Sequence, residues 1–119
     1  MKGRNAFPKT SRLRTSIHYQ QVWKQGRRYQ TAHFTAIISP NQQGLVRLGL
    51  TVSRKVGNAV CRNRLKRWLR EFFRCHLGHL DRSLDISIIV KSRAGFLDHS
   101  QVKQELHSLM TRLEADVHD

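Results

Sequence analysis

The segment from residue 58 to residue 74, NAVCRNRLKRWLREFFR, restricts the fold more than any other part of the sequence. On a helical wheel at 100° per residue, its apolar side chains gather within about 100° of one another, with Phe73 at the margin. Asn58 is a suitable N-cap, and Gly57 ends the element that precedes it. The segment therefore predicts one long helix, ending near His76, that packs a single face against a core. The residues of that apolar face are Cys61, Leu65, Trp68, Leu69 and Phe72.

The other side of this helix carries its charge. Six arginines and lysines stand among the seventeen residues, with a single acid, Glu71. A solvated helix face normally mixes both signs, because opposite charges four residues apart stabilise a helix and like charges destabilise it. A solvated face remains the alternative, but the excess of one sign indicates a surface that an anionic partner neutralises. On the wheel, Asn63, Arg67, Arg70 and Arg74 lie opposite the apolar face, Lys66 flanks them, and Arg62 and Arg64 lie on the two shoulders. These seven residues are called the cationic face below.

Charge is divided unevenly along the 119 residues. Residues 1–70 hold sixteen lysines and arginines and no acid, whereas residues 71–119 hold six against eight acids. The first part cannot neutralise itself internally, and a phosphate polymer is the natural counter-charge because binding releases its condensed counterions. An anionic membrane is the alternative partner for this charge. A chain that binds a membrane would be expected to have a strongly amphipathic terminal helix or a lipidation signal, and neither is present.

Length and hydropathy indicate one domain and a cytoplasmic location. A chain of 119 residues with 39% hydrophobic residues supports a single core. No apolar run approaches the ~18–20 residues that a membrane helix needs, and the start lacks the apolar stretch of a secretory signal. We expect residues 1–15 to form a basic N-terminal arm and residues 114–119 an acidic tail.

Periodicity predicts the remaining elements. The stretches 31–39, 45–53 and 84–92 predict strands, and residues 27–29 either extend the first strand or form a short one. We expect the first two strands to pair as a hairpin across a turn at 40–44, and the third to lie centrally. Helices are predicted from Ile17 to Gln25, capped by Ser16, and from Asp98 or Ser100 to about Leu113. This order predicts an α+β domain with one sheet covered by helices.

The ordered pattern R-x-G-L-x-V-S-x-K-x-G-x-A-V-x-R-N-R-x-K-R-x-x-R-E runs from Arg47 to Glu71. It resembles the signature motif of the protein subunit of bacterial ribonuclease P. The stretch RLRTSIHYQQVWKQGRR is similar to the first helix of that family, and FLDHSQVKQELHSLM to its last. The resemblance implies an α-β-β-β-α-β-α order, one mixed sheet and a left-handed β-α-β crossover, as in a ribosomal protein domain. The general rule alone would favour a right-handed crossover.

The resemblance also implies a function. In that family the partner RNA is the catalyst, acting with Mg²⁺ that the RNA mainly binds, and it removes the 5′ leader of precursor tRNA. The chain would then be a subunit of an endoribonuclease that binds the catalytic RNA and precursor tRNA. It would need no catalytic side chain, no metal of its own and no obligate protein partner. The sequence agrees, because it has no HExxH, no phosphate-binding glycine loop followed by lysine, and no acid before residue 71.

Two RNA sites follow from the resemblance, residue by residue. The first meets the catalytic RNA and the edge of the leader path, and consists of the cationic face with Arg54, Lys55 and Asn58 from the preceding loop. The second is a cleft in which Tyr19 and Trp23 would stack on unpaired leader bases. Spacing alone favours a core role for this aromatic pair. The floor of the cleft would be Thr35, Ile37 and Thr51, although the family often has an aromatic residue where Ile37 stands.

Other functions remain as alternatives. A ribosomal protein would share the charge and size, but the ordered motif and the aromatic pair argue against it. A DNA-binding regulator would need a helix-turn-helix or a dimer interface, and neither can be placed in the sequence. A membrane-surface protein and a stand-alone nuclease are the remaining classes, and the missing acids disfavour the nuclease.

Overall fold

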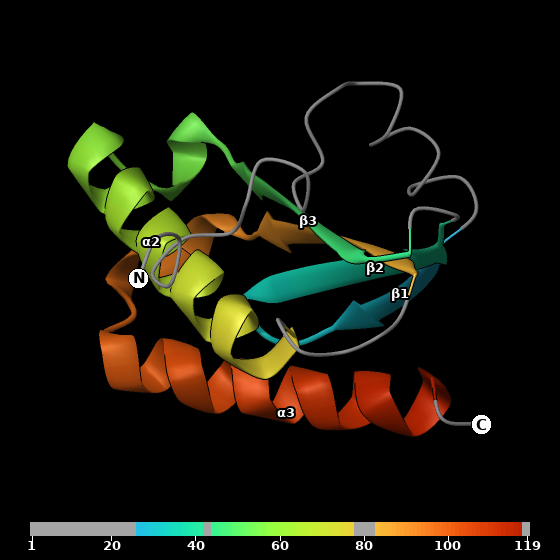
Figure 1. The fold of residues 1–119 in the computed structure, drawn as a ribbon. Helices are drawn as coiled ribbons and strands as arrows, with labels where there is room; N and C mark the ends of the chain where they lie inside the picture. Colours follow the sequence, from blue (N-terminus) through green and yellow to red (C-terminus); the bar gives the residue numbers. More distant parts are fainter. Residues whose placement is uncertain (1–25, 42–43, 78–82, 118–119) are drawn as a thin grey trace.

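The computed structural model describes residues 26–41, 44–77 and 83–117, and these build one sheet with two long helices on it (Figure 1). The predicted helix at 17–25 and the basic arm at 1–15 lie outside the described residues. The strands are β1 (Arg27–Gln30), β2 (Phe34–Pro40), β3 (Val46–Val52) and β4 (Leu84–Val90). The long helices are α2 (Ala59–Leu77) and α3 (His99–Val117), and the short 3-10 helices are η2 (Arg54–Val56) and η3 (Ser92–Phe96).

The strands lie in the order β1-β2-β4-β3. β4 pairs antiparallel with β2 and parallel with β3, so the predicted hairpin between 31–39 and 45–53 is wrong. The physical reason is that β4, LDISIIV, buries most of its residues and takes the interior position between the two strands expected to pair. The central place predicted for 84–92 is thereby confirmed. Residues 27–29 belong to a strand of their own, β1.

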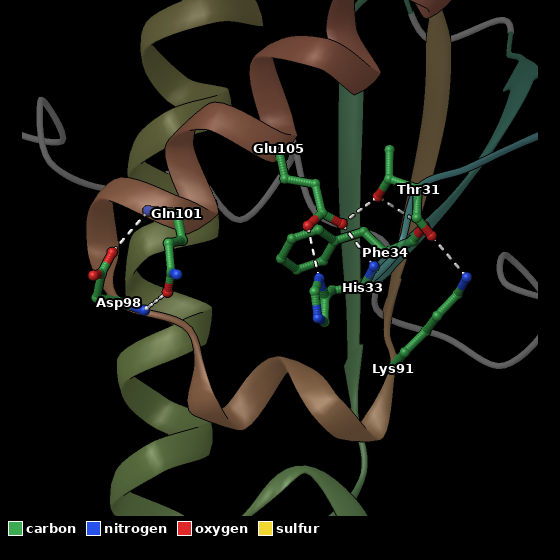
Figure 2. Close-up of polar contacts among 7 residues, drawn as sticks. All are labelled: Thr31, His33, Phe34, Lys91, Asp98, Gln101 and Glu105. Carbon is green, nitrogen blue, oxygen red and sulfur yellow. Dashed lines mark hydrogen bonds and ion pairs between the residues drawn. The ribbon is translucent and has the colours of Figure 1, made fainter.

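Both long helices begin at the caps that the sequence indicates. The Asn58 Oδ1 accepts a hydrogen bond of 2.9 Å from the Cys61 N–H at the start of α2. At α3, Asp98 Oδ1 accepts from the Gln101 N–H at 2.8 Å, and Gln101 Oε1 accepts from the Asp98 N–H at 2.9 Å (Figure 2). Ser100 therefore lies inside the helix rather than capping it. α3 runs past the predicted end at Leu113 to Val117, so the first part of the acidic tail is helical.

The core lies between the sheet and the two helices, which cover the same face (Figure 1). Phe73, at the margin of the predicted apolar face, is fully buried, whereas Trp68 is only half-buried and stacks on His99 with ring centroids 4.9 Å apart. The buried stripe of α2 therefore includes Phe73 and leaves Trp68 at its edge. Phe34 and Ile38 lie in this core.

A polar network joins the turn between β1 and β2 to the middle of α3 (Figure 2). Glu105 accepts hydrogen bonds from the Thr31 hydroxyl and, at 2.6 Å, from the backbone N–H of His33. Its second oxygen lies 2.8 Å from Nδ1 of His33. Burial raises the pKa of Glu105, but the hydrogen bonds from Thr31 and His33 outweigh that effect and hold the pKa below its ordinary value.

Glu105→Gln is expected to lower the free energy of unfolding by about 1–3 kcal/mol at pH 7, because charge-assisted hydrogen bonds are lost. A carboxylate with a lowered pKa stabilises the fold above its unfolded pKa and loses that effect as pH falls through its folded pKa. The difference between wild type and variant should therefore shrink below about pH 4.5. Urea unfolding at several pH values measures it, with Glu114→Gln, an exposed acid of the same helix, as control. If the free energies of unfolding of wild type and Glu105→Gln differed by the same amount at pH 3 and at pH 7, the stabilising role of the Glu105 carboxylate would be contradicted.

Candidate nucleic-acid interface

Helix α2 holds the cationic face by burying its opposite side. Leu65 and Leu69 are 1% and 0% exposed, and they fix the rotation of the helix against the sheet. Asn63 and Arg67 are exposed, as the wheel predicts. The other members of the cationic face are half-buried. For Arg62 and Arg64 this agrees with their place on the shoulders of the apolar face, whereas the wheel places Arg70 and Arg74 opposite the core. These half-buried residues are Arg62, Arg64, Lys66, Arg70 and Arg74.

Several guanidinium groups of α2 have no acidic partner within the described ranges. The Nε atoms of Arg62, Arg64 and Arg74 are buried there without a hydrogen-bond partner. The Cζ of Arg64 lies 5.3 Å from the centroid of the Trp68 ring, a cation–π contact that orients the side chain without neutralising it. Phosphate oxygens can accept from the terminal Nη groups of such arginines, whereas the buried Nε atoms are closed to them.

The loop before α2 adds cations to the same end of the helix. Val56 is buried and anchors η2, while Arg54 and Lys55 are exposed. Asn58 is also exposed, but its Oδ1 is the cap of α2, so at least that oxygen has a structural role. The loop residues assigned to RNA thus lie next to the first turn of the cationic face.

The predicted floor of the cleft lies on the other face of the sheet. Alternation along β2 places Phe34 and Ile38 in the core, so Thr35 and Ile37 point to the opposite side. Thr35 and Thr51 share that side because both are in register with the same residue of β4, Ile89. Thr35 and Ile37 are buried and Thr51 is half-buried. Tyr19 and Trp23, the predicted aromatic pair, lie outside the described residues.

Sequence reasoning missed Ile89, which stands between the two threonines and is half-buried. The alternation of LDISIIV could have revealed it, because Asp85, Ser87 and Ile89 fall on one face if Ile86, Ile88 and Val90 fall on the other. Thr35, Ile89 and Thr51 therefore form one row across β2, β4 and β3, next to the end of each strand, and Ile37 lies one row further along the same face, opposite Ser87.

Arg47, the first residue of the quoted motif, belongs to the fold rather than to the cationic surface. Its Nε and Nη2 donate to the two carboxylate oxygens of Asp85 at 2.7 and 2.8 Å. The side chains of Arg47 and Asp85 are only 12% and 6% exposed. Asn41 Nδ2 also donates to Asp85, at 2.7 Å. The motif therefore combines a structural cation on β3 with exposed cations on η2 and α2.

The described residues include no group of three or more histidine, cysteine or acidic side chains placed to hold a metal ion. Among the helices of the same ranges, none is long and apolar enough to cross a membrane. The clearest chemical feature of this part of the chain is therefore the cationic surface of α2 and η2.

Comparison with known proteins gives one consistent family. The family model Ribonuclease P matches residues 7–114. The ribonuclease P protein component of Syntrophus aciditrophicus is 42% identical over 104 residues, covering 87% of each chain. The component of Desulfovibrio desulfuricans is 42% identical over 114 residues, covering 92% of this chain and 88% of the relative.

Solved structures agree with the sequence relatives. The ribonuclease P protein of Staphylococcus aureus superposes with a TM-score of 0.82 at 30% identity, covering 88% of this chain and 96% of that one. The Thermotoga maritima protein superposes with a TM-score of 0.74 at 33% identity, covering 85% and 96% of the two chains. The motif, the α+β fold and these relatives lead to one conclusion: the chain belongs to the family of bacterial ribonuclease P protein subunits.

Proposed function

We propose that the chain binds the catalytic RNA of ribonuclease P through the cationic face and η2, and the 5′ leader of precursor tRNA through the opposite face of the sheet. The observation that carries the proposal is the cation-rich surface on α2 and η2. Its exposed and half-buried cations run from Arg54 to Arg74, and the segment from 53 to 70 contains no acid. Such a surface matches a phosphate backbone.

The contribution of the chain is binding and positioning. Two RNA molecules repel each other through their phosphates, and cations between them reduce that repulsion. Holding the leader fixes the scissile phosphodiester relative to the RNA catalyst, which lowers the entropic cost of reaching the reactive geometry. The Mg²⁺ that assists hydrolysis is assigned mainly to the RNA subunit, and no side chain of this protein is assigned a catalytic step.

The leader site can be tested by substrate discrimination. The double variant Tyr19→Ala/Trp23→Ala, assembled with the catalytic RNA, should bind precursor tRNA more weakly, because each lost stacking contact costs about 1–3 kcal/mol. Its affinity for mature tRNA, which has no leader, should be nearly unchanged. Equilibrium binding to both substrates under the same salt conditions gives the comparison. Equal losses for both would mean that the two aromatic residues serve the fold rather than the leader.

A further inference from the structure

The 3-10 helix η3 presents an aromatic side chain to solvent. Phe96 is 91% exposed, and Val60, on the first turn of α2, is 74% exposed. They are the exposed large hydrophobic residues of the described ranges. A single exposed apolar side chain is ordinary and needs no explanation. Phe96 differs because its backbone is firmly held and its surroundings are cationic.

Packing against η2 holds the backbone of η3 in place. Ala94 is fully buried, its N–H donates to the Lys91 carbonyl at 3.0 Å, and its carbonyl accepts from the Leu97 N–H at 3.1 Å. Gly95 lies so close to η2 that a Cβ there would be 2.2 Å from the carbonyl oxygen of Val56. Phe96 follows this close backbone contact, so the aromatic ring projects from a supported turn.

The neighbours of Phe96 carry positive charge. η2 contacts η3 and contributes exposed Arg54 and Lys55, and η3 itself contributes exposed Arg93. The first turns of α2 contact η3 directly, because Cys61 Sγ donates to the Gly95 carbonyl at 3.7 Å. The nearest acid along the chain is Asp98, and its carboxylate is engaged in the cap of α3, where it accepts a hydrogen bond from the Gln101 N–H. The Phe96 patch comprises Arg54, Lys55, Val60, Arg93 and Phe96.

We propose that Phe96 stacks on an unpaired base of the catalytic RNA, next to the phosphates held by the patch and the cationic face. This inference rests on the proposed function and adds a base contact to a surface otherwise made of phosphate contacts. A flat aromatic face surrounded by cations suits an unpaired nucleotide, because the base stacks while the cations meet its phosphates. A second copy of this chain is a poor occupant, since two patches of the same sign would repel each other.

Three substitutions at this position separate stacking from other effects. Phe96→Ala should weaken binding to ribonuclease P RNA about 5- to 150-fold. Phe96→Tyr should bind like wild type, and Phe96→Leu, apolar but not flat, should bind like Phe96→Ala. The slope of log affinity against log salt should stay the same in all three, because no phosphate contact is removed. Thermal unfolding of the free variants should match wild type, because the side chain is exposed.

The contact can also be located directly. A benzoylphenylalanine introduced at position 96 of the full chain should crosslink, in the assembled complex, to one or a few nucleotides of the catalytic RNA. Equal affinity of wild type and Phe96→Ala, full rescue by Phe96→Leu, or crosslinks to the precursor tRNA leader alone would overturn the inference. A dimer of the wild-type chain that Phe96→Ala abolishes would assign the patch to self-association instead.

The test distinguishes this inference from the function on which it rests. If wild type binds the RNA and Phe96→Ala binds equally well, only the stacking contact is refuted. If wild type itself shows no preference for ribonuclease P RNA over an unrelated RNA of equal length, the proposed function fails and the stacking contact fails with it.

Discussion

Replacing Asp85 with alanine is expected to lower the free energy of unfolding by about 3–5 kcal/mol. The substitution leaves the guanidinium of Arg47, whose side chain is only 12% exposed, without the carboxylate that accepts both of its hydrogen bonds. It also removes one of the two acceptors of the Asn41 Nδ2 group, which keeps its hydrogen bond to the Leu45 carbonyl. A buried charge without a partner is among the most destabilising changes in a protein interior. Thermal unfolding should show a Tm lower by roughly 10–20 °C.

The double variant Arg47→Met/Asp85→Leu separates the charge from the packing. Apolar replacement of a whole buried pair is often neutral, so this variant should recover much of the stability that Asp85→Ala loses. Asp98→Ala, which removes the cap of α3, is a matched control with an expected cost of about 1 kcal/mol. A Tm for Asp85→Ala within a few degrees of the Asp98→Ala value would contradict the structural role of the pair.

Removing two arginines from the cationic face is expected to change how RNA affinity depends on salt. Each phosphate contact contributes about 0.7–0.9 to the slope of log affinity against log salt. Arg67→Ala/Arg70→Ala should therefore reduce the slope by roughly 1.4–1.8. Titration of the catalytic RNA at several salt concentrations measures it, and the loss of affinity should be greatest at low salt.

Lys103 and Arg112 provide the control for this experiment. Both are exposed cations, but they stand on α3, outside the cationic face. Lys103→Ala/Arg112→Ala removes the same formal charge and should leave the slope nearly unchanged. Equal reductions in both double variants would mean that RNA senses only the net charge of +14, and an unchanged slope in the α2 variant would mean that this face is merely solvated.

Local structure was well predicted from the sequence where the interactions are themselves local. The helix at 58–76 appears as α2 with Asn58 at its cap, because periodicity and capping depend on residues a few positions apart. The sheet order failed for the opposite reason. Pairing the strands at 31–39 and 45–53 assumed that neighbours in sequence pair in space, whereas burial on both faces placed β4 between them.

The same difference between local and long-range interactions explains which features of the candidate interface could be predicted. The exposure of Arg67 follows from the wheel, but the half-burial of Arg74 depends on side-chain packing that periodicity does not describe. The pairing of Arg47 with Asp85 joins residues far apart in the chain, and no local pattern indicates it. The supported position of Phe96 likewise requires the contact between Gly95 and Val56, which comes from tertiary structure alone.

The most direct test of the account is cleavage of 5′-labelled precursor tRNA at low, near-physiological Mg²⁺. Three reactions are compared: the protein alone, bacterial ribonuclease P RNA alone, and the two together. The account predicts cleavage at the mature 5′ end that appears or greatly accelerates only when both are present. A protein that leaves the RNA reaction unchanged, or that cuts precursor tRNA without RNA, would contradict it.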